Sequence, residues 1–137
     1  MKRTDQKVRV SEYSYSRNDT LYTEDIFTCS GVGVINQDEE AWIGHMSTPE
    51  DIEQFFEIIC SNTGTAEVSQ IVVNGGSYLP DNSQAMRDSE SNWRKSVEEA
   101  ENRFVDSNII TKRIPPRYKS SLYVSPEGYN IQMEALK

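Results

Sequence analysis

The segment between Cys29 and His45 constrains the fold of this chain most strongly, because it has the pattern of a β-hairpin. Apolar, β-prone stretches lie on both sides of the polar sequence Asn36-Gln37-Asp38-Glu39-Glu40, which predicts strand, turn and strand. In an antiparallel hairpin, residues equally far from the turn face each other. Cys29 and His45 are equally far from Gln37. We therefore expect the only histidine to lie within about one register step of one of the two cysteines.

A thiol beside an imidazole can act as a nucleophile, because the imidazole accepts the thiol proton and the thiolate attacks electrophilic carbon. Spacing alone leaves a second interpretation open. In it, Cys29 is a small apolar core residue and His45 is a hydrogen-bonded residue at a strand end. The hairpin predicts that the two side chains are close, and a chemical role for them needs further support.

Composition limits the class of partner. The chain has 137 residues, near the commonest domain size, and we expect a single domain over residues 1–137. Its formal net charge of −8 disfavours nucleic acid, because binding to phosphates depends on basic side chains that release counterions. The expected partner or substrate is therefore another protein, and the oligomeric state stays open.

The sequence also predicts the compartment and the state of the thiols. No apolar run follows the charged start Met1–Lys7, so no cleaved secretory signal is expected. No stretch approaches the roughly 18 apolar residues of a membrane span. We expect Cys29 and Cys60 to be free thiols, and we expect no metal site, since one histidine and two distant cysteines lack zinc-type spacing. The predicted location is cytoplasmic, with export by a route without a cleaved signal left open.

Two helices are predicted. The first begins at the N-cap Thr48 with Pro49 in its first turn, carries the apolar stripe Ile52, Phe55, Phe56 and Ile59, and closes at Ser61-Asn62-Thr63-Gly64. The second is long and polar, from about Ser83 to Asp106, and we expect Trp93 to anchor it to a sheet.

Further strands are predicted before and after the helices, and Ser11 to Asp19 is predicted to be a loop or an irregular edge. Besides the hairpin, the expected strands are 8–10, 21–28 running into Cys29, 68–74, 108–114, 119–125 and 129–135. The turn Pro126-Glu127-Gly128 is expected to join the last two as a hairpin. This order of elements predicts the α+β class, with two helices packed on a sheet.

Taken together, these elements resemble the chemoreceptor glutamine deamidases (the CheD family), which are similar in turn to the catalytic domain of the cytotoxic necrotizing factor toxins. The family places a threonine six residues before its cysteine, as Thr23 stands before Cys29. Its histidine on the return strand is followed closely by a helix-starting proline, as in His45-Met46-Ser47-Thr48-Pro49. A buried strand then ends in a double glycine, as in Val73-Asn74-Gly75-Gly76, and a final hairpin has a turn like Pro126-Glu127-Gly128.

The resemblance covers about residues 7 to 136 and implies mixed, largely antiparallel β-sheets in a layered α/β/β sandwich with two main helices. It implies a cysteine-dependent amidohydrolase that deamidates glutamine side chains of a protein substrate, without a metal or organic cofactor. Cys29 would be the nucleophile, His45 the base, and Thr23 the residue that orients the imidazole ring.

The resemblance also suggests groups around the reacting amide. Backbone N–H groups at Cys29 and Ser30, or near Gly31, are candidates for stabilising a tetrahedral oxyanion. Asn74, Gly75 and Gly76 could shape the rim of a pocket, although an ordinary strand-to-loop turn explains them equally well.

Two other functions are weighed against this one. A non-catalytic acidic module that keeps the fold and binds a basic partner would account for the charge and for the long polar helix. Thiol redox chemistry is disfavoured because the chain has no Cys-x-x-Cys motif. The choice between deamidation and transglutamination, and the target protein, stay open.

Overall fold

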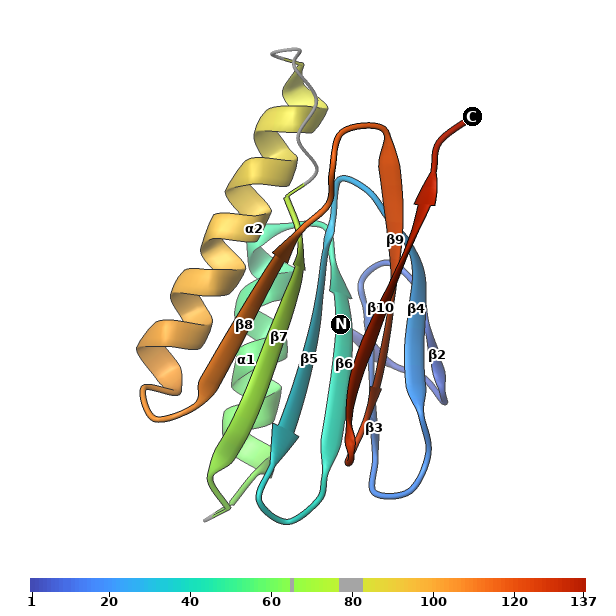
Figure 1. Ribbon diagram of the computed structural model, residues 1–137. Helices are drawn as coiled ribbons and strands as arrows, with labels where there is room; N and C mark the ends of the chain where they lie inside the picture. Colours follow the sequence, from blue (N-terminus) through green and yellow to red (C-terminus); the bar gives the residue numbers. More distant parts are fainter. Residues whose placement is uncertain (65, 77–82) are drawn as a thin grey trace.

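The computed structural model describes residues 1–64, 66–76 and 83–137 and has three layers, helix, sheet and sheet (Figure 1). A six-stranded sheet in the middle has the order β1-β3-β6-β5-β7-β8, and a four-stranded sheet on one of its faces has the order β10-β9-β4-β2. The helices α1 and α2 cover the other face. The predicted α+β class and the layered α/β/β arrangement are confirmed.

Most neighbouring strands are antiparallel, and three pairs (β1 with β3, β2 with β4, β7 with β8) are parallel. The central sheet consists of β1 Lys2–Arg3, β3 Glu12–Ser16, β6 Ala41–Met46, β5 Ser30–Asn36, β7 Val68–Gly75 and β8 Asn108–Arg113. The outer sheet consists of β10 Gly128–Ala135, β9 Tyr118–Ser125, β4 Leu21–Ile26 and β2 Lys7–Val8. The strands β5 and β6 are buried along their whole length because layers cover both of their faces.

The two predicted helices are present. Helix α1 spans Pro49–Asn62, and the hydroxyl oxygen of its N-cap Thr48 accepts a hydrogen bond from the Asp51 N–H at 3.2 Å. Helix α2 spans Gln84–Arg103 with Ser83 as its N-cap. Within the described parts of the chain, neither helix is long and apolar enough to cross a membrane.

Two apolar clusters hold the layers together. The stripe Ile52, Phe55, Phe56 and Ile59 of α1 is fully buried against the helix-facing side of the central sheet. Between the two sheets, a second cluster packs residues such as Ile43, Leu122 and Val124. Trp93 of α2 is partly buried against the first cluster, as predicted, and its ring lies under the Arg113 guanidinium, 4.2 Å from ring centroid to Cζ.

Three local predictions were wrong. The segment Ser11 to Asp19 is not a loop throughout, because Glu12–Ser16 forms β3 and pairs with β6. The strand expected at Val8–Val10 is shorter and lies at Lys7–Val8. The strand expected to run into Cys29 ends at Ile26, after a bulge in which Asp25 has a φ of 56°.

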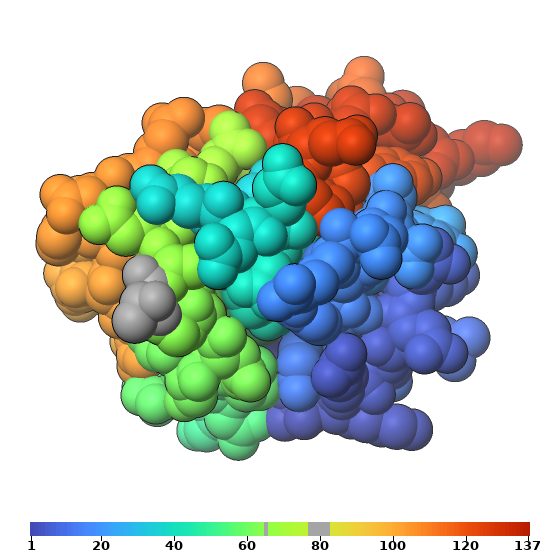
Figure 2. Space-filling model, turned by 90° about the horizontal axis from the view of Figure 1, so that it is seen from below, coloured from blue at the N-terminus to red at the C-terminus, as the bar shows by residue number. Residues whose placement is uncertain are grey.

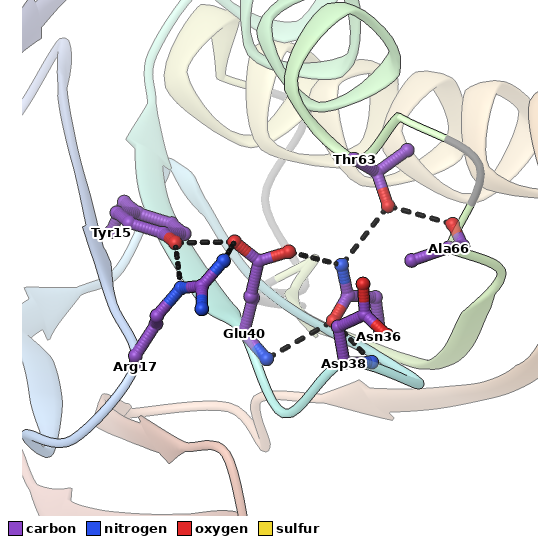
Figure 3. A network of polar contacts seen from close by, with 7 residues as sticks. All are labelled: Tyr15, Arg17, Asn36, Asp38, Glu40, Thr63 and Ala66. Atoms are coloured by element: carbon purple, nitrogen blue, oxygen red, sulfur yellow. Dashed lines mark hydrogen bonds and ion pairs between the residues drawn. The ribbon is translucent and has the colours of Figure 1, made fainter.

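The β5–β6 turn lies at one end of the sandwich, between the C-terminal end of α1 and the β3–β4 connection (Figure 2). Glu40 in this turn is buried, with 7% of its surface exposed. Its carboxylate accepts hydrogen bonds from the Tyr15 hydroxyl, from Asn36 Nδ2 at 2.9 Å, and from Arg17 at 3.3 Å (Figure 3). Asn36 Nδ2 also donates to Thr63 beyond α1 at 3.1 Å, so this network ties three elements together.

Candidate functional site

The predicted site lies at the other end of the sandwich, where β5 begins and β6 ends (Figure 1). His45 pairs directly with Gly31, and the last pair of the ladder is Ser30 with Met46. Cys29 is in the bend just before β5 and is partly exposed. The hairpin therefore brings His45 to the Cys29 end of β5, but in a register two residues later than a direct Cys29–His45 pair.

His45 is 2% exposed and faces the outer sheet, where Thr23 of β4 lies. Thr23 Oγ1 is 2.7 Å from His45 Nδ1 and 2.7 Å from the carbonyl oxygen of Val8. A carbonyl oxygen only accepts, so the single hydroxyl proton of Thr23 is donated to Val8. The hydroxyl oxygen must then accept from Nδ1–H of His45.

This hydrogen-bond chain fixes the tautomer of the ring. With the proton on Nδ1, the lone pair of His45 is on Nε2. Nε2 is buried and has no hydrogen-bond partner among the described residues. A buried acceptor without a partner is costly, and a catalytic role is one of the explanations for such a group.

Both candidate reacting groups are neutral in this arrangement. Burial lowers the pKa of His45 from 6.5 to about 4, against the attraction of the Asp25 carboxylate. Burial also raises the pKa of the Cys29 thiol; a hydrogen bond with the Thr28 side chain opposes this shift, and the negative charge of Asp51 adds to it. No hydrogen bond joins the Cys29 thiol to His45. The resting pair is thus a thiol and a neutral imidazole.

The pKa of His45 gives a prediction for stability. The folded state holds the ring neutral down to about pH 4, whereas the unfolded chain takes up a proton near 6.5. Protons therefore favour unfolding below about pH 6.5, and the stability due to the neutral ring is lost as the pH falls toward 4.

Between pH 7 and pH 4, the wild type is expected to lose about 3 kcal/mol more of its free energy of unfolding than His45→Asn does. Urea unfolding of both proteins across this range measures the difference. If the free energies of unfolding of the two proteins fell equally between pH 7 and pH 4, the fold would not hold the ring neutral.

Ser30 and Gly31 flank the thiol on the strand side. Ser30 is fully buried, and its hydroxyl has no hydrogen-bond partner in the part of the chain that the structure describes. Gly31 pairs with His45 on one side and with Asn74 on the other, so its backbone belongs to the ladder of a central strand. A backbone donor for an oxyanion is thus better placed at Cys29 or Ser30 than at Gly31.

The three residues at the end of β7 lie near this end of the sheet but differ in what they contact. Asn74 is fully buried, and its side chain is engaged at both ends, donating to the Lys112 carbonyl at 3.1 Å and accepting from the Ser120 hydroxyl at 2.5 Å. It therefore does not offer its amide to a substrate in this structure. A Cβ on Gly75 would lie 2.9 Å from the Cys29 carbonyl oxygen, so the absence of a side chain there lets the thiol-bearing bend approach β7.

Gly76 has a φ of +63°, a conformation that favours glycine, and it packs against the Trp93 ring. It lies against α2, so packing explains its presence without a role in a pocket rim.

The prediction of site residues from sequence missed Asp51 and Ser11. The side chain of Asp51 is half-buried in the first turn of α1, and its Oδ2 accepts from the Ser11 hydroxyl at 2.7 Å and from the Ser47 N–H at 3.3 Å. Ser11 reaches this position because its φ is 64°, and its own N–H donates to the His45 carbonyl at 2.7 Å. The motif Thr48-x-x-Asp51 resembles a capping box, which was the available sign that Asp51 folds back on the chain.

Among residues 1–64, 66–76 and 83–137, no group of three or more His, Cys, Asp and Glu side chains could hold a metal ion. Cys60 is exposed on α1, and its sulfur is 3.9 Å from Arg103 Nη1. The second thiol therefore does not belong to the site around Cys29.

A scan against models of known protein families finds no match for this chain, and a search of curated proteins finds none either. The residues at the start of β5 and the end of β6 are therefore the basis for a functional proposal.

Proposed function

We propose that this protein is a cysteine-dependent amidohydrolase that deamidates glutamine side chains of a protein substrate, as a single CheD-like domain over residues 1–137. The observation that carries the proposal is the buried Nε2 of His45, which has a lone pair and no partner among the described residues and belongs to the strand that pairs with β5 just after Cys29. The Thr23 hydrogen bond, which orients this ring, is the second support. The proposed location is the cytoplasm.

In the proposed reaction, His45 Nε2 accepts the proton of the Cys29 thiol as the sulfur attacks the side-chain carbonyl carbon of glutamine. Backbone N–H groups at Cys29 or Ser30 stabilise the tetrahedral oxyanion. His45 then gives its proton to the departing nitrogen, and ammonia leaves. Water attacks the thioester with His45 again as base, and the products are glutamate and the regenerated thiol.

Because the thiol and the imidazole are both neutral at rest, the proton moves during the attack. The thiol has no hydrogen bond to His45 in this structure, so substrate binding has to bring the two into line. Catalytic hydrogen bonds that tighten only in the substrate complex are common.

The test is ammonia release from a library of glutamine-containing peptides, with Cys29→Ser as the inactive comparison. The wild type is expected to release ammonia with matching conversion of glutamine to glutamate, and Cys29→Ser is expected to fall to background. Cys60→Ser is the matched control, because Cys60 is the other free thiol and lies outside the site. Release that does not depend on Cys29, or no release from any peptide, would refute the hydrolase.

A second candidate is a non-catalytic acidic module that binds a basic protein. It is favoured by the raised pKa of the Cys29 thiol and by the lack of a hydrogen bond between this thiol and His45. This candidate predicts that Cys29→Ser binds the partner as tightly as the wild type does.

A further inference from the structure

The Asp51 carboxylate is held firmly by one of its two oxygens. Oδ2 accepts from the Ser11 hydroxyl, from the Ser47 N–H and from the Ser47 hydroxyl at 2.7, 3.3 and 3.3 Å. None of these contacts involves Oδ1, and no described residue donates to that oxygen. The side chain is therefore fixed in place by Oδ2, and Oδ1 can still accept a hydrogen bond.

The anchor places this carboxylate beside the thiol. Ser30 and Met46 form the last pair of the β5–β6 ladder, and Cys29 and Ser47 are the next residues outward on the two strands. Because Ser47 makes two of the three bonds to Asp51, the negative charge lies across the mouth of the hairpin from the sulfur. Among the described residues, Asp51 is also the charged group that contributes to the raised pKa of Cys29.

Asp51 has no cation within ion-pair distance among the described residues. Glu40, Glu90 and Glu99, which are also buried or half-buried, each lie 2.6–3.3 Å from an arginine, whereas the half-buried Glu12 accepts a hydrogen bond from the Arg9 N–H. Asp51 lies in the first turn of α1, where the helix dipole and its three hydrogen bonds stabilise the negative charge without a cation. Its second oxygen is therefore available to pair with a cation that a ligand brings.

From this geometry we propose that Asp51 recognises a lysine or arginine next to the target glutamine, so that the substrate is a basic segment of a protein. The inference rests on the proposed function for its reacting amide and extends it to the class of substrate. The net charge of −8 also favours a basic substrate, since it attracts a basic protein toward this chain at long range.

Recognition by Asp51 has a consequence for the thiol. A substrate cation that pairs with Asp51 cancels the negative charge that opposes the thiolate. The right substrate would therefore make the sulfur easier to ionise at the moment it binds, which couples recognition to reactivity.

The first experiment measures binding without turnover. Two fluorescein-labelled peptides share a central glutamine, which is flanked by lysines in one and by glutamates in the other. Fluorescence anisotropy at 0.15 M salt, where charges more than about 8 Å apart are largely screened, compares their affinities for Cys29→Ser. We expect the basic peptide to bind at least about tenfold more tightly than the acidic peptide. Adding Asp51→Asn to Cys29→Ser is expected to weaken binding of the basic peptide about fivefold.

The matched control is Glu50→Gln, which removes the same charge from the neighbouring, exposed position of α1. It is expected to change the affinity by less than about twofold. The asparagine at position 51 keeps an oxygen that can accept from Ser11 and Ser47, so the loop is expected to keep its shape. Equal losses in the two variants would mean that the net charge alone attracts the peptide, and would overturn a specific role for Asp51.

The second experiment follows alkylation of Cys29 by iodoacetamide in a Cys60→Ser background. Asp51→Asn is expected to raise the rate about threefold at pH 7.5 and Glu50→Gln to leave it unchanged, because the charge of Asp51, and not that of Glu50, adds to the burial that opposes ionisation of the thiol. An unchanged rate in Asp51→Asn would contradict the proposed position of the charge.

The two proposals fail in different ways. Deamidation of both peptides at equal rates would overturn the role of Asp51 and would still support the proposed hydrolase activity. Binding of the basic peptide that depends on Asp51, without deamidation, would refute the hydrolase and support Asp51 as the recognition group of a binding module.

Discussion

Replacing His45 by asparagine is expected to lower kcat/KM for glutamine deamidation about a thousandfold. The asparagine amide can still donate to Thr23 from a position close to that of Nδ1, so the hydrogen bond to β4 is kept. What is lost is Nε2, the atom proposed to accept the thiol proton, and general bases of this kind contribute about 10²–10⁴-fold. The measurement is ammonia release at saturating and limiting peptide concentrations, with circular dichroism to establish that the variant is folded.

The pH profile distinguishes a catalytic from a merely structural His45. Because burial lowers the pKa of His45 to about 4, the wild-type rate is expected to stay level from pH 7 down to about pH 5 and then to fall as the ring takes up a proton. An acid limb near pH 6.5 would contradict a buried, neutral base. A rate in His45→Asn within about threefold of the wild type would remove His45 from the mechanism.

Thr23 provides a matched pair of variants for the same site. Thr23→Ser keeps the hydroxyl that accepts from His45 Nδ1–H and donates to Val8, and it is expected to retain most of the activity. Thr23→Val has nearly the same shape but leaves both of these groups unpaired and frees the ring to change tautomer. Thr23→Val should therefore be less active than Thr23→Ser, although it preserves the shape of the original side chain better.

The largest expected effect on stability is at Glu40, at the opposite end of the sandwich. Glu40→Ala leaves the Tyr15 hydroxyl, Asn36 Nδ2 and the Arg17 guanidinium without their shared acceptor. The side chain of Arg17 is 65% exposed and can turn to water, so the cost comes from the Tyr15 and Asn36 donors that lose a charged acceptor, and we expect about 2–3 kcal/mol. For a chain of this length the loss corresponds to a fall in Tm of about 8 °C. Thermal unfolding at pH 7 measures it.

The control for Glu40 is the adjacent Glu39, which is exposed in the same turn. Glu39→Ala removes the same atoms and is expected to change stability by less than about 0.5 kcal/mol. If both variants lost the same stability, the turn itself rather than the carboxylate network would be responsible.

The effect of Glu40 also depends on pH. Burial alone would raise its pKa, but hydrogen bonds from Tyr15 and Asn36 and the charge of Arg17 hold the pKa below the usual 4.5. A carboxylate with a lowered pKa stabilises the fold above its unfolded pKa, and this contribution disappears as the pH falls through the folded value. The difference between wild type and Glu40→Ala should therefore shrink below about pH 4.5.

The prediction of the hairpin from the sequence was right in outline and wrong in register. The structure centres the turn on Asp38 instead of Gln37, because Asn36 Oδ1 accepts hydrogen bonds from the backbone N–H groups of Asp38 and Glu40, at 3.0 Å each. Moving the centre by one residue moves the partner of His45 by two, from Cys29 to Gly31. The identity of a side-chain acceptor in the turn therefore decided which residue faces the histidine.

The missed strand β3 has a similar explanation. In its sequence Glu12-Tyr13-Ser14-Tyr15-Ser16, the β-prone tyrosines alternate with serines, but the Ser, Asn and Asp residues around them favour a loop, so the local pattern allowed either. In the fold, Tyr13 and Tyr15 pack against the helix-side core while Ser14 is buried on the other face, donating to the Thr4 carbonyl at 2.9 Å. Burial by other elements made a strand of a segment whose local pattern did not require one.

The sequence alone determined the elements whose causes are local. The N-cap Thr48 with its apolar stripe specifies α1, and the tight turn after Ser125 specifies the last hairpin, because hydrogen bonds and contacts within a few residues suffice for each. It also placed Thr23 and His45 in one candidate site. The tertiary structure alone decided the protonation of that site and the neighbours of its thiol. Burial sets the pKa values of His45 and Cys29, and the position of Asp51 depends in part on its hydrogen bond with Ser11, a residue distant in the sequence that no local pattern links to it.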